Sequence, residues 1–171
     1  MGGKQRTRSS EERYGATGLD VFEKTLQTTH IWLNDITEVI GPDKQVAWNV
    51  LGAVLRTLRD RVPLQVAAHL GAELPLLVRG LYYDQWHTSD QPERYRTLDE
   101  FLGRVAEQFG PIRPIEPAEA TRAVFSLLSR YIPEGQIRKV REALPEGVRA
   151  LWNVPAPGSE LSGAVEGPVT A

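Results

Sequence analysis

The sequence repeats itself once, at a fixed offset of 70 positions and without a gap. The matching pairs include Pro63 with Pro133, Pro75 with Pro145, Ala53 with Ala123, Leu58 with Leu128 and Arg79 with Arg149. Further upstream, residues 32–42 and 101–111 align at an offset of 69 and both end in Gly-Pro. Each copy is too short to bury its own apolar residues. We therefore expect the two copies to pack together around one core.

Helical periodicity runs through both copies, with apolar residues three or four positions apart. In residues 19–41 the apolar face consists of Phe22, Leu26, Trp32 or Leu33, Ile36, Val39 and Ile40, and Gly41-Pro42 ends the helix. Asp43 is the expected N-cap of a second helix, with Val46, Val50, Leu51, Val54 and Leu58 on one face. Pro63 and Pro75 suit the first positions of two more helices. The periodicity resumes at residue 98, and no stretch alternates like a strand.

The predicted fold is all-α, a helical bundle of two tandem repeats of about four helices each, related by a pseudo-two-fold axis. Residues 19–88 form the first repeat, 89–97 a linker and 98–152 the second repeat, all within one compact domain. Residues 1–18 are predicted to be a disordered basic arm. Residues 153–171 are predicted to be a disordered tail, because they contain Pro and Gly without periodicity.

Composition narrows the classes of function. The chain has 171 residues and no cysteine, which excludes disulfides, thiol catalysis and thiolate metal sites. Its net charge of −2 gives no general attraction to nucleic acid or anionic membranes. No apolar run reaches the roughly 20 residues of a membrane span, and no secretory signal begins the chain. We therefore predict a cytoplasmic protein without membrane contact.

Residues 66–80, VAAHLGAELPLLVRG, have the spacing of a DNA-binding helix-turn-helix. The helix after Pro75, however, provides a single arginine among apolar and aromatic residues, whereas base recognition needs polar side chains at the start of the helix. The second copy also replaces Gly71 with Arg141. A short basic strip, Arg138, Lys139 and Arg141, supports contact with nucleic acid or another anion. Nucleic-acid binding is therefore our second hypothesis.

The segments LGAELPLLVRGLYYDQW (70–86) and LPEGVRALW (144–152) resemble a bacterial family described only as domain of unknown function 2267. The resemblance covers about residues 22–152. It implies an all-helical, cytoplasmic bacterial protein. It implies no reaction, cofactor or catalytic residue.

The aromatic cluster at the end of the first copy is the clearest candidate site. Tyr82 is expected in the core, because it continues an apolar face and matches Trp152. Tyr83, Trp86 and His87 form the candidate patch for a protein partner or for self-association, since Tyr and Trp are enriched at interfaces. The alternative is that Trp86 covers the boundary between the repeats.

Arg79 and Arg149 occupy equivalent positions in the two copies. We expect each to cap helix carbonyls or to pair across the pseudo-two-fold axis. The alternative is a pair of anion ligands in a pocket between the repeats. The histidines lack metal-ligand spacing, and no catalytic motif is present. The sequence therefore favours a non-enzymatic protein without a cofactor that binds a protein partner or itself.

Overall fold

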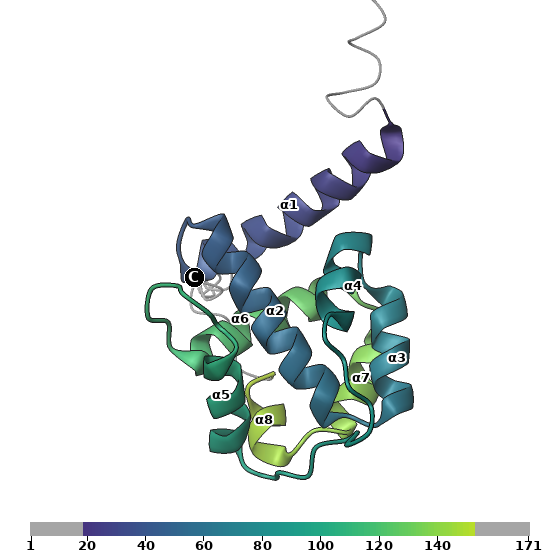
Figure 1. Ribbon diagram of the computed structural model, residues 1–171, viewed down its shortest axis with the longest axis vertical. Coiled ribbons are helices and arrows are strands. Elements are labelled where there is room, and N and C mark those ends of the chain that lie inside the picture. Colours follow the sequence, from purple (N-terminus) through teal and green to yellow (C-terminus); the bar gives the residue numbers. More distant parts are fainter. Residues whose placement is uncertain (1–18, 153–171) are drawn as a thin grey trace, which may run out of the picture.

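A computed structural model describes residues 19–152, and within this range the chain forms eight α-helices and no strand (Figure 1). The helices are α1 (Asp20–Ile40), α2 (Lys44–Arg61), α3 (Leu64–Glu73), α4 (Leu76–Tyr83), α5 (Leu98–Glu107), α6 (Pro117–Tyr131), α7 (Glu134–Glu142) and α8 (Glu146–Ala150). The all-α prediction is confirmed. The predicted arm (1–18) and tail (153–171) lie outside the described residues. Among residues 19–152, no helix combines the length and apolar character that crossing a membrane requires.

Local chemistry explains the helix ends. Gly41 follows α1 with φ 112°, a conformation that side chains disfavour, and donates its N–H to the Thr37 carbonyl. Asp43 is the N-cap of α2, as predicted, and accepts hydrogen bonds from the next residues' amides. Pro63 and Pro75 are not the first residues of their helices, as the sequence predicted, but the residues just before them. Their extended ψ angles, 149° and 154°, make them N-cap residues, so α3 and α4 begin one residue later.

Helix α2 runs through the centre of the molecule and packs against α1, α4, α5 and α6 (Figure 1). Its predicted apolar face is buried. Residues outside that face are buried as well: Gly52, Ala53, Leu55, Thr57 and Arg59. A helix buried around most of its circumference forms the core of a bundle, rather than its surface.

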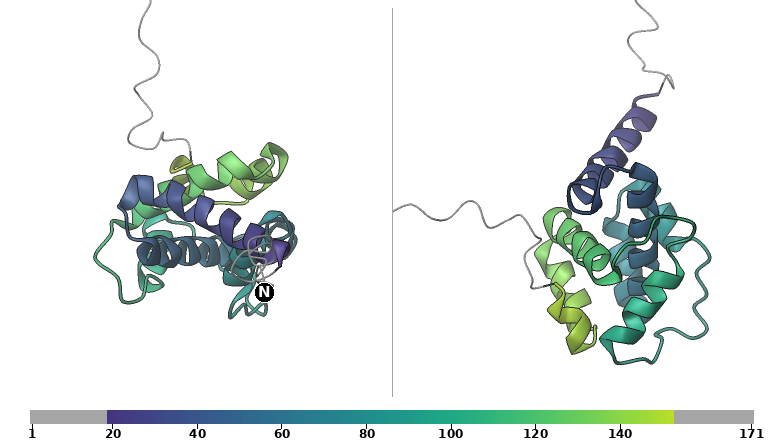
Figure 2. Two further views of the ribbon diagram at one scale, coloured as in Figure 1. Left: turned by 90° about the horizontal axis from the view of Figure 1, so that it is seen from above. Right: turned by 90° about the vertical axis from the view of Figure 1, so that its left-hand side faces the viewer.

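Helix α1 is anchored to the body from Thr29 onward, the first buried residue along the chain within the described range. Trp32 stacks on Tyr131 of α6, with ring centroids 5.4 Å apart. Asp35 accepts hydrogen bonds from the Tyr131 hydroxyl at 2.7 Å and from Arg130 at 2.9 Å. Before Thr29 the helix continues without a break and projects from the body (Figures 1 and 2).

The helices after α2 and α6 follow the sequence repeat. Helices α3 and α7 begin 70 positions apart, and so do α4 and α8. Helices α3 and α7 also pack against each other. The pseudo-two-fold relation between the halves remains a prediction.

Candidate functional site

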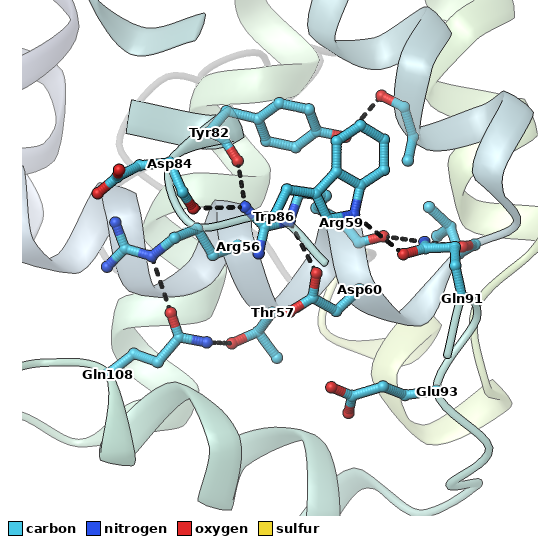
Figure 3. A network of polar contacts seen from close by, with 12 residues as sticks. Arg56, Thr57, Arg59, Asp60, Tyr82, Asp84, Trp86, Gln91, Glu93 and Gln108 are labelled. Atoms are coloured by element: carbon cyan, nitrogen blue, oxygen red, sulfur yellow. Dashed lines mark hydrogen bonds and ion pairs between the residues drawn. The ribbon is translucent and has the colours of Figure 1, made fainter. Parts of the chain in front are cut away.

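The segment between α4 and α5 is held against the end of α2 by a buried arginine (Figure 3). Arg59 is 3% exposed. Its Nη1 donates to the carbonyls of Tyr82 and Asp84 at 2.7 and 3.0 Å, and its Nε donates to the Asp60 carboxylate at 2.7 Å. A buried guanidinium is tolerated where its charge is paired and its donors are used. Arg59 thereby fixes to α2 the start of the segment 84–97, which includes the predicted linker 89–97.

Trp86 covers this arginine (Figure 3). The Arg59 guanidinium lies 5.7 Å from the centre of the indole ring, within cation–π range. The indole N–H donates to the Gln91 side chain at 3.1 Å, and Gln91 donates to the carbonyls of Arg59 and Val62. Trp86 thus covers the end of α2 and joins it to the following segment.

Tyr83 also packs inward. Its ring stacks on Trp86, with centroids 5.3 Å apart, and its hydroxyl donates to the Ala68 carbonyl at 3.3 Å. Tyr83 and Trp86 are only partly exposed, while His87 is exposed. Tyr83 and Trp86 therefore have a structural role, and a partner patch formed by these two residues and His87 stays a prediction. Tyr82 is fully buried, which confirms its predicted place in the core.

A second branch of the network reaches α5 (Figure 3). Arg56 donates its Nε to Gln108 at 2.8 Å, and Gln108 donates to the Thr57 hydroxyl at 3.3 Å. Burial, followed by the neighbouring positive charge of Arg59, lowers the pKa of Arg56 from its ordinary value. The network therefore links the end of α2 to helices from both halves of the sequence.

Arg79 and Arg149 make the same kind of contact. Arg79 donates to the carbonyls of Ala72 and Leu74 at 3.1 and 2.9 Å, at the end of α3. Arg149 donates to the carbonyls of Glu142 and Leu144 at 3.5 and 3.0 Å, at the end of α7. These are the carbonyls that a helix end leaves without partners, so the expected capping role is confirmed.

The helix-turn-helix spacing has a packing explanation. Gly71 lies inside α3 rather than in the turn, and a Cβ there would overlap the Tyr83 hydroxyl. The second copy has Arg141 at this position, and its sequence has no tyrosine at the position equivalent to Tyr83. The start of α4 presents exposed leucines, Leu76 and Leu77, instead of the polar groups that read bases.

The basic strip lies on α7, where Arg138 and Lys139 are exposed and Arg141 is partly buried. A surface pocket of ≈ 410 Å³ lies elsewhere, lined by residues 89–94 and Arg104. Arg79 and Arg149 do not line this pocket. Within residues 19–152, no group of three or more potential metal-binding side chains comes together.

Several of the exposed apolar residues lie at the start of α1. Alternating steps of three and four residues define what we call the α1 seam: Leu19, Phe22, Leu26, Thr29, Leu33, Ile36 and Ile40. From Thr29 onward the seam is buried in the body. Its beginning is uncovered, with Leu19 51%, Phe22 52% and Leu26 41% exposed. Phe22 and Leu26 belong to the face predicted from periodicity, but they lie beyond the core that buries the rest of that face.

Other exposed apolar residues lie on α1 and on α4. Val21 is exposed one position before Phe22, and α4, which packs against α1, exposes Leu76 and Leu77. Ile31 is also exposed on α1, but its position does not belong to the three-four pattern of the seam. Ile31 therefore provides a matched control for the seam residues.

The chain belongs to a family described as "Uncharacterized conserved protein (DUF2267)", whose model matches residues 29–151. The resemblance stated from the two sequence motifs is therefore confirmed. None of the curated proteins matches the chain. The exposed part of the α1 seam, Leu19 to Leu26, precedes the matched region.

Two features of the structure could not be predicted from the sequence. The spacing of the α1 seam is visible in the sequence, but the point near Thr29 at which the other helices stop covering it is not. The contacts of Arg59 could not be predicted, because its partners lie up to 32 residues away along the chain. An arginine near the end of a helix ordinarily indicates a solvated position.

Proposed function

We propose that this protein is a non-enzymatic helical interaction module, and that the exposed part of the α1 seam is its docking surface for another protein. One observation carries the proposal: the apolar seam continues past the body with Leu19, Phe22 and Leu26 uncovered. Burying a side chain such as Phe or Leu contributes about 1.5–3 kcal/mol. A partner that covers this surface therefore has a substantial source of binding energy.

The arrangement of the seam supports a stable presentation of these residues. Isolated helices of two or three turns are marginal in water. Here the projecting turns continue a helix whose middle is fixed by the Trp32–Tyr131 stack and by Asp35. The docking surface is thereby pre-organised, which lowers the entropic cost of binding.

We also propose that the body is a duplicated unit with pseudo-two-fold symmetry. The equal 70-residue offsets of the helix starts and the equivalent capping contacts of Arg79 and Arg149 support it. In this view the duplicated body is the scaffold, and the start of α1 is an addition to it. The cytoplasmic location remains a prediction.

The test is a nuclease-treated pull-down from cells that make the protein, with three full-length baits. These are the wild type, the double variant Phe22→Asp with Leu26→Asp, and Ile31→Asp as the control. We expect a protein, either another chain or an untagged copy of this one, to be recovered with wild type and Ile31→Asp. The same protein should be lost with the double variant, because each aspartate places a charge in an apolar interface.

Identical recovery with all three baits would contradict the proposal. Recovery that disappears with nuclease, and on neutralising Arg138, Lys139 and Arg141, would instead establish nucleic-acid binding. In that case affinity would also fall steeply with added salt.

A further inference from the structure

The segment between α4 and α5, which connects the two sequence copies, forms most of a surface pocket. The pocket has a volume of ≈ 410 Å³ and is lined by residues 89–94 and by Arg104 of α5. Small-molecule sites are clefts of about 300–1,000 Å³. Pro92 is the only apolar residue in this lining. The pocket therefore suits a small polar molecule.

Contacts to neighbouring elements hold the lining in place. The Gln91 side chain donates to the Arg59 carbonyl (Figure 3), and the Glu93 amide donates to the Asp60 carbonyl at 2.8 Å. From the other side, Arg104 donates to the Glu93 carboxylate at 2.5 Å. A site that is already ordered loses less entropy when a ligand binds. The pocket is therefore largely pre-formed.

Charges of both signs line the pocket. Glu93 and Arg104 form an ion pair with each other. The side chains of Asp90 and Arg94 are exposed, and neither makes a hydrogen bond or ion pair with another residue that the structure describes. A carboxylate accepts from an ammonium group, and a guanidinium donates paired hydrogen bonds to a carboxylate. The pocket thus provides one free partner for each charge of a zwitterion.

We propose that this pocket binds a small polar zwitterion, of which a free amino acid is the simplest kind. Asp90 pairs with its ammonium group and Arg94 with its carboxylate. A molecule with a single charge leaves one of these two residues without a partner, so it binds more weakly. Because both pairs lie at the surface, where water weakens them, we expect a Kd of about 1–10 mM.

The linker provides a local signal of binding. Gln91 accepts the indole N–H of Trp86 at 3.1 Å, and it lies between the two residues that hold the ligand. A bound zwitterion joins residues 90 and 94 and so restrains Gln91. The indole N–H signal of Trp86 in an NMR spectrum should therefore move as the pocket fills. This site does not involve the α1 seam, so it is independent of the proposed docking surface.

The test is an NMR titration of the purified full chain with each of the common free amino acids, up to about 50 mM at constant ionic strength. We expect at least one polar amino acid to shift the amide signals of residues 89–94 and the Trp86 indole signal with one saturating curve. Trp86→Phe identifies the indole signal. The absence of saturating shifts from every amino acid would overturn the inference.

Three variants and one derivative test the assignment of the two charges. Asp90→Asn and Arg94→Gln should each raise the Kd about fivefold, the upper end for an exposed ion pair. Arg96→Gln is the matched control, because Arg96 is exposed on the same segment but does not line the pocket. The N-acetylated form of the ligand, which lacks the ammonium group, should also bind more weakly. Equal affinity of the wild type and the two pocket variants, or of the free and acetylated ligands, would overturn the zwitterion site.

Discussion

Replacing Ile36 with aspartate is expected to unfold the domain, whereas replacing Phe22 with aspartate should leave its stability almost unchanged. Both residues belong to the α1 seam, but Ile36 is fully buried and Phe22 is 52% exposed. A carboxylate at position 36 would lose its hydration without gaining a partner. We therefore expect the free energy of unfolding to fall by more than about 4 kcal/mol.

At position 22 the aspartate remains in water near the start of the helix, where an acidic side chain is favourable. The expected change there is within about 0.5 kcal/mol. Urea unfolding followed by circular dichroism, at about 1 µM protein so that association between chains does not contribute, measures both effects. Equal losses for the two variants would mean that Phe22 is packed in the core, and the docking proposal would fail with it.

Replacing Arg59 with alanine is expected to lower the free energy of unfolding by about 3 kcal/mol, the lower end of the cost of breaking a buried ion pair, because Asp60 is only partly buried. The substitution leaves the Tyr82 carbonyl without its donor and Asp60 without its counter-charge. It also removes the cation beneath Trp86. The segment 84–97 should therefore separate from α2 before the remaining helices unfold.

Two readouts measure this effect. Urea unfolding gives the global loss, and limited trypsin digestion gives the local one, through faster cleavage after Arg94 and Arg96. Arg61→Ala is the matched control. Arg61 lies in the same turn and donates to the Tyr95 carbonyl at 2.9 Å, but it is only partly buried. Its loss should cost about 1 kcal/mol. Equal effects of the two variants would show that the burial of Arg59 adds nothing to its hold on this segment, because Arg61 also contacts it through the Tyr95 carbonyl.

Most of the fold was predictable because its signals are local. Gly41-Pro42, Asp43 and the paired prolines mark helix ends through backbone constraints that act within a few residues. The repeat offset correctly assigned Arg79 and Arg149 equivalent capping roles. Such contacts recur with the repeat, because each arginine caps the helix directly before its own.

The site was less predictable because exposure depends on the whole fold. Tyr83 and Trp86 have the composition of an interface, and the sequence does not show that their rings stack on each other or that Trp86 covers Arg59. Phe22 and Leu26 have the spacing of a core face, but the body does not extend far enough to cover them. Periodicity identifies an apolar stripe without showing which protein covers it.

We propose above all that the start of α1 binds another protein. A photo-crosslinking amino acid placed at position 22, in cells that make the protein, tests this most directly, with position 31 as the control on the same helix. We predict a discrete crosslinked species, visible as a heavier band, from position 22 and none from position 31. The absence of a crosslink at position 22, or the same products from both positions, would contradict the account.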